Sequence, residues 1–315
     1  MNPSGAPTEP SLRLADNATV ARYRIHGVPL VVHADDRAVL ARVNDTYGWF
    51  ADDHPAPDPG DAPGRAPVTV AYRTDRAGGA TIVDSHGREI VLTERDEPLV
   101  SLFDAIVAGL IGGLSAVGIL TVHAGVVAHD GRAILIAGRS GRGKTTLVLG
   151  LLRRGLDLLS DELALVAADD RTILAYPRGV HVRPAALDLF PELRYLGGLP
   201  AHPLGGGSEW SIGPAALERS FGAAVAPSAP IGAVILLDGD PIPDGAPELL
   251  AVPGAVATME LLRGTPAAAW DFDGVLARLP RVVADVPCVR LRSARLEPTI
   301  DAILAWVAQP SRAAR

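Results

Sequence analysis

The chain has 315 residues, 48% of them hydrophobic, and a formal net charge of −7 at pH 7. This length suits two domains or one large core with an appendage. The acidic balance argues against the basic surface that nucleic-acid binding needs, so we predict no nucleic-acid partner. The single cysteine, Cys288, excludes an internal disulfide, and its apolar surroundings in the sequence favour a place in the core over a role as nucleophile. The polar first residues lack the apolar stretch of a secretory signal, so we expect a cytoplasmic protein.

The N-terminal part of the chain predicts a tail and a small domain. Residues 1–16 are rich in Pro and Ser, which is typical of a flexible tail. Residues 17–95 predict a mainly β region, with two early strands, a helix capped by Asp35 or Asp36, and a three-strand meander. Within this region, residues 51–67 hold five prolines and four aspartates and predict a loop. The sequence does not indicate what the region binds.

Residues 99–120 are almost wholly apolar, with Asp104 as the one charge. By length alone this segment is able to span a membrane. Its four glycines, the charge of Asp104 and the lack of basic flanks instead favour a helix buried beneath a sheet. We therefore predict no membrane partner.

A phosphate-binding motif follows this segment. Residues 119–137 predict a β-hairpin with a tight turn at residues 129–132, and residues 144–154 predict a helix that ends at Gly155. The loop between hairpin and helix matches the pattern G-x-x-x-x-G-K-[ST] through Gly138, Gly143, Lys144 and Thr145.

The loop has the residue types that phosphate binding requires. Glycines let successive backbone N–H groups turn toward phosphate oxygens, and the following helix points its positive dipole end at the same oxygens. Lys144 reaches the β- and γ-phosphates, and the Thr145 hydroxyl ligates Mg²⁺. We therefore predict ATP and Mg²⁺ as cofactors. The predicted nucleotide contacts are Gly138, Arg139, Ser140, Gly141, Arg142, Gly143, Lys144, Thr145 and Thr146.

The composition supports this interpretation of the loop. Lys144 is the only lysine in the chain, and the other 28 of its 29 basic residues are arginine. A compact ammonium fits among phosphate oxygens where a planar guanidinium does not. A chain that otherwise uses arginine therefore keeps lysine at the one position where the phosphate loop needs it.

Two acidic sites compete for the role of metal partner. Asp161 and Glu162 follow the strand after the phosphate-loop helix, so a β-α-β unit brings both carboxylates beside Lys144. Asp238 ends an apolar strand, which is the general form of a Walker B acid. Each site also has a plain structural interpretation, since both sequences suit turns at the end of a strand.

The last part of the chain predicts further elements of an α/β fold. Residues 184–230 are rich in Pro, Gly and Ala, and we predict that part of this stretch is a surface loop over the site. The remaining predictions are a central buried strand at residues 231–237, a short helix at 256–262, a late strand at 287–291 and a closing helix around 300–307.

Three basic side chains precede that stretch. In an extended segment, alternation places His181 and Arg183 on one face, and Arg178 lies close before them. These residues are candidates to contact the γ-phosphate or an acidic substrate. The alternative is a solvated edge strand.

Three motifs together resemble the catalytic domain of HPr kinase/phosphorylase. They are His123-Ala-Gly, the loop from Gly138 to Thr146, and Leu159-Ser-Asp-Glu162, in this order and at suitable separations. The chain is similar, more closely, to the HPr-kinase-like proteins encoded beside lasso-peptide and related peptide biosynthesis genes. The resemblance covers residues 100–185 well. It implies an α/β fold in which a P-loop mixed sheet with flanking helices, residues 96–315, follows the mainly β region.

The resemblance also implies an activity and roles for individual residues. It implies an ATP- and Mg²⁺-dependent kinase that phosphorylates a serine hydroxyl of a peptide or protein, with precursor-peptide tailoring as the setting, and it allows a homo-oligomer. Asp161 would be the base that takes the proton of the serine, with His123 near it and Lys144 on the phosphates. Glu162 would help Asp161 and Thr145 to hold Mg²⁺.

The sequence departs from the family pattern in three places. The second acid is Glu162 where the family usually has aspartate, the downstream family signature finds no convincing match, and the N-terminal region differs from that of the bifunctional enzymes. These departures argue against phosphorylase activity and against HPr as the substrate. Two alternatives therefore stay open: a kinase of a small-molecule hydroxyl, and a non-catalytic nucleotide-binding protein that regulates or recruits a partner.

Overall fold

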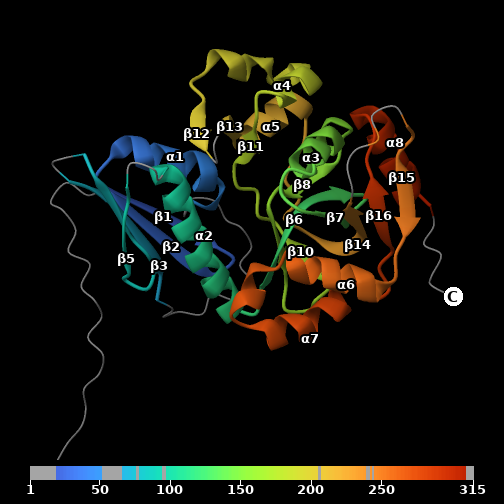
Figure 1. Cartoon of the computed structure of the whole chain (residues 1–315), viewed down its shortest axis with the longest axis horizontal. Helices are drawn as coiled ribbons and strands as arrows, with labels where there is room; N and C mark the ends of the chain where they lie inside the picture. The colour runs from blue at the N-terminus through green and yellow to red at the C-terminus, as the bar shows by residue number, and fades with distance from the viewer. Residues whose placement is uncertain are drawn as a thin grey trace, which may run out of the picture.

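The chain forms a mixed α/β structure in which a small N-terminal sheet precedes a larger mixed sheet (Figure 1). A computed structural model describes residues 19–51, 66–75, 78–93, 97–204, 207–238, 242 and 245–309. The predicted tail, residues 1–16, and residues 52–65 of the predicted loop lie outside the described residues.

The N-terminal sheet has five strands in the order β1-β2-β3-β4-β5. Its strands are β1 (Thr19–Ile25), β2 (Val28–Ala34), β3 (Val68–Thr74), β4 (Ala80–Val83) and β5 (Glu89–Val91). Only β2 and β3 pair in parallel, and they are connected through helix α1 (Arg37–Tyr47) and the 3-10 turn η1 (Gly48–Phe50). The predicted cap of α1 is confirmed, since the Asp36 side chain accepts a hydrogen bond from the N–H of Ala38 at 2.7 Å.

The apolar segment forms helix α2 (Pro98–Ala116), which packs against β3, β2 and β4 of the N-terminal sheet and against β6 of the larger sheet. Leu102, Ile106, Leu110 and Leu114, spaced four residues apart, are fully buried. Among the described residues α2 is the one helix whose length and composition would allow a membrane crossing, and core helices of soluble proteins pass the same test.

Two glycines let α2 lie directly on the N-terminal sheet. A Cβ at Gly113 would lie 2.7 Å from a methyl group of Val28, and a Cβ at Gly109 would lie 2.6 Å from a methyl group of Val68. Gly112, on another face of the helix, has no neighbouring atom within 4 Å of a Cβ position. The two glycines one turn apart therefore serve close packing, whereas Gly112 only lowers helix propensity.

Alanine at these positions should have opposite effects. Gly113→Ala forces α2 away from β2 and should lower the free energy of unfolding by about 1–3 kcal/mol. Gly112→Ala, the matched control, should raise it by about 0.5–1 kcal/mol because alanine favours the helix. Urea denaturation of both variants measures the difference. Equal stability of the two variants would show that α2 does not need the close contact.

The larger sheet is built around strand β6 (Leu120–His129) and its hairpin partner β7 (Arg132–Ala137). Its other strands are β8 (Asp157–Ser160), β9 (Leu163–Val166), β10 (Thr172–Leu174), β14 (Ser228–Leu237), β15 (Glu248–Ala251) and β16 (Cys288–Arg292). One edge of β6 pairs with β9 and then with β8, while β7 pairs with the other edge. β10 joins β9 to β14, so the ladder β6-β9-β10-β14-β7 closes on itself. The predicted hairpin and the predicted central strand, now β14, are confirmed.

Helices cover the sheet on two sides. α3 (Lys144–Arg153) contacts α8 (Leu296–Val307), whereas α6 (Gly254–Arg263), η3 (Pro266–Ala269) and α7 (Phe272–Val282) form the other layer (Figure 1). Alternate residues of β7 enter the two cores, with Ile134 and Ile136 beside α3 and α8, and Leu135 beside α6 and α7. Cys288 is buried, as predicted, and burial raises the pKa of its thiol to about 11, so it is a core residue.

Residues 184–230, part of which we expected to be a surface loop over the site, form a largely ordered subregion in the described residues, and some of them line the candidate cavity. The subregion holds α4 (Ala186–Leu189), η2 (Pro191–Gly198), β12 (His202–Leu204), β13 (Gly207–Ile212) and α5 (Pro214–Phe221), and β13 pairs with β11 (Val180–Val182). Phe190, Leu193, Leu196 and Leu217 are buried in it. These apolar residues are widely spaced among Pro, Gly and Ala, so they form no regular pattern in the sequence that would predict a helix or a strand. Gly205 and Gly206, part of the glycine run, lie outside the described residues.

The N-terminal sheet and the larger sheet share one hydrophobic core. Buried residues of β1 to β4, α1 and α2 belong to the same cluster as buried residues of β6, β9, β14, α6 and α7. The rings of Phe50 and Tyr176, from the two parts, lie 5.6 Å apart. The boundary predicted after residue 95 stays a prediction, but the two parts are packed together without a gap in the core.

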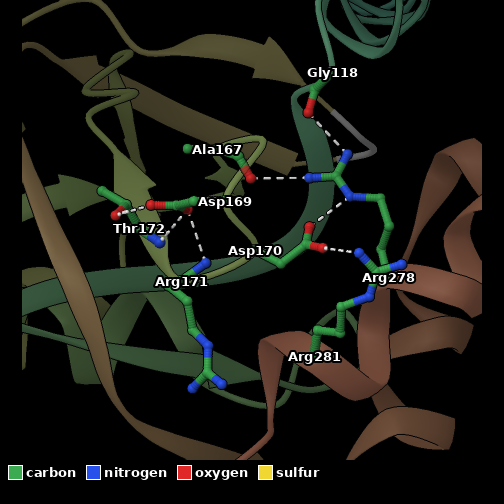
Figure 2. A network of polar contacts seen from close by, with 8 residues as sticks. All are labelled: Gly118, Ala167, Asp169, Asp170, Arg171, Thr172, Arg278 and Arg281. Atoms are coloured by element: carbon green, nitrogen blue, oxygen red, sulfur yellow. Dashed lines mark hydrogen bonds and ion pairs between the residues drawn. The ribbon is translucent and has the colours of Figure 1, made fainter.

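A buried ion pair fastens α7 to the larger sheet (Figure 2). Asp170 adopts a left-handed conformation, φ +56°, in the turn between β9 and β10, and its side chain is only 3% exposed. Arg278 donates to the Asp170 carboxylate at 2.6 Å, to the carbonyl of Gly118 at 2.8 Å and to that of Ala167 at 2.9 Å. Arg281 reaches the same carboxylate at 3.2 Å, but 65% of its side chain is exposed.

The two arginines should therefore differ in their contribution to stability. Arg278→Ala leaves the buried Asp170 carboxylate poorly compensated and removes the hydrogen bonds that Arg278 donates to the carbonyls of Gly118 and Ala167, so it should cost about 3–5 kcal/mol of unfolding free energy. Arg281→Ala removes only an exposed pair and should cost less than about 1 kcal/mol. Thermal and urea unfolding of both variants tests this. A similar decrease in unfolding free energy in the two variants would mean that the net charge, and not the buried network of Asp170, stabilises the packing of α7.

Candidate functional site

The phosphate loop connects the end of β7 to the start of α3, as predicted. Gly141 has φ +79° and Gly143, which is the N-cap of α3, has φ +88°, a left-handed region that favours glycine. Within the described part of the chain, no side chain caps this helix end. The first N–H groups of α3 therefore point out of the helix toward the loop, which is the arrangement that binds anions.

Lys144 is held inside the loop. Its ammonium donates to the carbonyl of Gly138 at 2.8 Å and to that of Arg139 at 3.3 Å, and the residue is 8% exposed. Burial lowers the pKa of Lys144, while the charges of Asp161 and Glu162 oppose this. Two of the three ammonium donors are used by loop carbonyls, which leaves one for a phosphate oxygen.

Asp161 comes to the same edge of the sheet through a split β-α-β unit. Both β7 and β8 are antiparallel to β6, which lies between them, so they run parallel to each other. Their carboxyl ends therefore meet at one edge and bring Asp161, just after β8, beside the loop. The Thr145 hydroxyl donates to Oδ2 of Asp161 at 3.0 Å. Burial raises the pKa of Asp161 to about 6, although the hydrogen bond from Thr145 acts against this rise.

These two residues fit a magnesium ion. Oδ1 of Asp161 is buried and has no hydrogen-bond partner among the described residues, and Asp161 is one of the residues that line a cavity. A carboxylate oxygen and a hydroxyl are hard oxygen ligands, and magnesium in nucleotide sites takes one or two such groups with phosphates and water. The described residues contain no group of three or more His, Cys, Asp or Glu side chains arranged as a metal site.

Glu162 has a different partner from Asp161. Its Oε2 lies 2.6 Å from Nη2 of Arg178, whose side chain is 7% exposed. Burial opposes the charge of Arg178, but the pKa of Arg178 is raised because Glu162, Tyr47, Tyr176 and Asp161 together favour the charged form. The structure therefore pairs Glu162 with Arg178, and its predicted contact with magnesium stays a prediction.

A polar chain continues from Arg178 across the cavity. Nη2 of Arg178 lies 3.1 Å from Nε2 of His181, whose Nδ1 lies 3.9 Å from Glu209. Burial and the charge of Arg178 lower the pKa of His181 to about 4, so the ring is neutral at pH 7. Nε2 then accepts from Arg178, and the proton is on Nδ1, facing Glu209. Arg183, although 68% exposed, lies 3.6 Å from the same carboxylate.

His123 of β6 lines the cavity and lies within the electrostatic reach of Glu162. Its backbone N–H donates to the carbonyl of Gly264 at 2.7 Å. Burial and then the charge of Lys144 lower the pKa of the His123 ring, while the charge of Glu162 raises it. The predicted strand histidine is thus close to the charged groups of the loop, and its catalytic role stays a prediction.

One cavity of about 650 Å³ collects these residues. Of the predicted residues it is lined by His123, Ser140, Gly141, Gly143, Lys144, Thr145, Thr146, Asp161, Glu162, Arg178, His181 and Arg183. Gly138, Arg139 and Arg142 form the base of the loop without lining the cavity, and a hydrogen bond from the N–H of Arg142 to the carbonyl of Arg139 closes a turn there.

The structure also separates the two candidate acids. Asp238 follows β14, its Oδ2 lies 3.1 Å from Nε of Arg290, and 55% of its side chain is exposed. It is not among the described residues that line the cavity. Asp161, by contrast, is buried and hydrogen-bonded to Thr145 of the loop. The geometry therefore favours Asp161 over Asp238 as the carboxylate that partners the loop.

Sequence reasoning missed part of the cavity wall. Glu209 comes from β13, in the subregion that we expected to be a loop, and carries no signal in the sequence. Val100, Phe103, Asp104 and Val107 come from α2. Asp104 did carry a signal, as the one charge of an apolar segment, but only the structure places it at the cavity.

A second cavity, of about 880 Å³, lies between α1, β13 and α5. It is lined by Trp49, Tyr195 and Trp210 among others, and by none of the predicted site residues. The smaller cavity is the candidate site because it alone combines the phosphate loop with buried titratable groups.

Comparisons with known proteins add little to this geometry. No protein-family model matches the chain, and no curated protein matches it. Among solved structures, the chain is similar to the Hpr(Ser) kinase/phosphatase from Coxiella burnetii, with 14% identity and a TM-score of 0.31 over 60% of this chain and 99% of that one. At this TM-score the two backbones differ too much for the likeness to support an argument about function.

Proposed function

We propose that the chain is an ATP- and Mg²⁺-dependent kinase that transfers the γ-phosphoryl group to a hydroxyl, a serine of a peptide or protein. The observation that carries the proposal is the placement of a buried, partly unpartnered Asp161 beside the phosphate loop and against Thr145. The motif resemblance described above supports the serine acceptor and a role in tailoring a precursor peptide.

The residues of the cavity have the roles that phosphoryl transfer needs. The loop N–H groups and Lys144 bind the phosphates of ATP. Thr145 and Asp161 would hold Mg²⁺, which supplies charge neutralisation on the phosphates. Arg178, which is buried, lines the cavity and is paired with Glu162, offers a second fixed positive charge.

Asp161 also suits the role of the base. Its pKa of about 6 makes it mostly ionised at pH 7 and basic enough to accept a proton. In the transfer, the acceptor oxygen forms a bond to the γ-phosphorus as its proton passes to Asp161. The bond from the γ-phosphorus to the β–γ bridging oxygen breaks, and ADP leaves with that electron pair.

The test is incubation with ATP, Mg²⁺ and peptides encoded by neighbouring genes, followed by intact mass measurement. The proposal expects a gain of one phosphate on a serine-containing peptide with wild-type protein. Tight ATP binding with no phosphorylated peptide would favour the alternatives, a small-molecule acceptor or a non-catalytic nucleotide-binding protein. Addition of small-molecule alcohols to the same assay separates these two.

A further inference from the structure

Helix α2 contributes to the wall of the cavity that Arg178, His181 and Glu209 also line. Val100, Phe103, Asp104 and Val107 line the cavity. These positions are spaced i, i+3, i+4 and i+7, so they lie on one face of the helix. We call this face the α2 wall. Other residues of α2 are buried against the N-terminal sheet, so the helix has an apolar core face and a second, mostly apolar face on the cavity.

Asp104 is unusual in this wall because it is the only charged residue of α2. Within the described part of the chain, no hydrogen bond or ion pair joins its carboxylate to another residue. Burial, and then the charge of Glu162, raise the pKa of Asp104, while Arg178 acts in the opposite direction. Asp104 is nevertheless an exposed residue that lines the cavity, so its carboxylate is accessible to a basic side chain of a bound molecule.

The other carboxylates of the cavity are engaged by residues of the chain. Glu162 is paired with Arg178, and Glu209 lies beside Arg183. Asp161 faces Thr145 and the phosphate loop, but its Oδ1 is buried, 8% of the residue is exposed, and that oxygen has no partner among the described residues. The cavity thus has one unpartnered oxygen at the loop, where phosphoryl transfer would occur, and one unpaired carboxylate on the α2 wall.

We infer that the α2 wall binds the phosphate acceptor, and that this acceptor is a peptide segment carrying a basic side chain and an apolar side chain next to its serine. This inference rests on the proposed function. Asp104 pairs with the basic side chain, and Val100, Phe103 and Val107 contact the apolar one. The serine then lies between the α2 wall and the loop, so the wall with Asp104 receives the cationic acceptor while the loop receives the anionic nucleotide.

Direct binding measurements test the inference without requiring phosphate transfer. The probes are two fluorescein-labelled hexapeptides, Ala-Leu-Arg-Ser-Leu-Ala and the same peptide with Glu in place of Arg. Fluorescence anisotropy is measured with the full chain, with and without Mg²⁺ and a non-hydrolysable ATP analogue. Wild-type protein should bind the Arg peptide at least about tenfold more tightly than the Glu peptide.

Variants of the α2 wall should change this ratio in a defined way. Asp104→Asn should bring the two affinities within about twofold of each other, and Asp104→Arg should reverse the preference. Phe103→Ala should weaken both peptides equally, because it removes only the apolar contact. Asp273→Asn, on α7 and away from the cavity, removes the same charge from the chain and should leave the ratio unchanged.

Three results would overturn the inference: equal binding of both peptides by wild-type protein, a ratio that survives Asp104→Asn, or no binding of either peptide. A fluorescent ATP analogue, titrated separately against wild type and Lys144→Ala, reports on the phosphate site alone. Nucleotide binding without peptide discrimination would refute the α2 wall as the acceptor site and leave the nucleotide site standing. Peptide discrimination without nucleotide binding would instead refute the proposed kinase.

Discussion

Asp161→Asn should abolish phosphoryl transfer and at the same time make the unliganded protein more stable at pH 8. Asparagine keeps the size of the side chain and an oxygen that accepts from Thr145, but it neither accepts a proton nor neutralises magnesium. Loss of a general base alone costs about 10²–10⁴-fold in rate. Nucleotide binding through the loop should persist. The measurement is the rate of phosphate incorporation by intact mass, beside a titration with ATP.

The gain in stability follows from the burial of the Asp161 charge. Its pKa is near 4 in the unfolded chain and about 6 in the folded one, so the folded state binds the proton more tightly. The contribution of Asp161 to the free energy of unfolding is therefore largest below pH 4. It is lost as the pH rises through 6. Asparagine does not titrate, so the variant should exceed wild type by on the order of 2 kcal/mol at pH 8.

Thermal unfolding at pH 5 and pH 8 measures this difference, which should grow with pH. Asp238→Asn is the matched control, because that carboxylate is half exposed and paired with Arg290. It should leave both the transfer rate and the stability nearly unchanged. Retained transfer in Asp161→Asn together with loss in Asp238→Asn would assign the role of the acid to Asp238 instead.

Lys144→Ala should remove nucleotide-dependent phosphorylation, with a loss of at least about 10²–10³-fold. The ammonium is buried between two loop carbonyls, where the proposed function places the phosphates. Lys144→Arg keeps the charge but should fail as well, because a planar guanidinium does not fit between the carbonyls of Gly138 and Arg139. An active Lys144→Arg variant would show that charge alone, and not the shape of the ammonium, is needed.

The composition provides a second test of this residue. Lys144 is the only lysine in the chain, so an amine-reactive reagent has one side-chain target. Saturating ATP with Mg²⁺ should lower the modification of Lys144 by more than tenfold, as measured by peptide mass spectrometry. Modification of the N-terminal amine should not change and is the internal control. Equal labelling of Lys144 with and without ATP would rule out nucleotide binding at the loop.

Much of the site was predictable because its signals are local. The phosphate loop needs a strand, left-handed glycines, a lysine and a helix in immediate succession, and all of these are consecutive in the chain from Ala133 to Arg153. The placement of Asp161 followed from connectivity, since a strand after a crossover helix returns to the same edge of the sheet. The structure adds that β6 lies between the two strands of this unit.

The subregion between α4 and α5 was not predictable in the same way. Its elements are short, and its core side chains, such as Phe190 and Trp210, are separated by stretches rich in Pro and Gly. Periodicity requires a run of regular spacing, and these elements are too short to show it. The burial of Glu209 against Arg183 and His181 therefore emerged only from the folded chain.

The sequence by itself determined the phosphate loop, the choice of its lysine and the order of the main strands, because each depends on residues that are neighbours in the chain. Only the tertiary structure decided between Asp161 and Asp238, paired Glu162 with Arg178, and placed Asp104 of α2 at the cavity. These arrangements join residues from separate elements. They depend on how β6, α2 and β11 pack against one another, and no spacing along the chain encodes that packing directly.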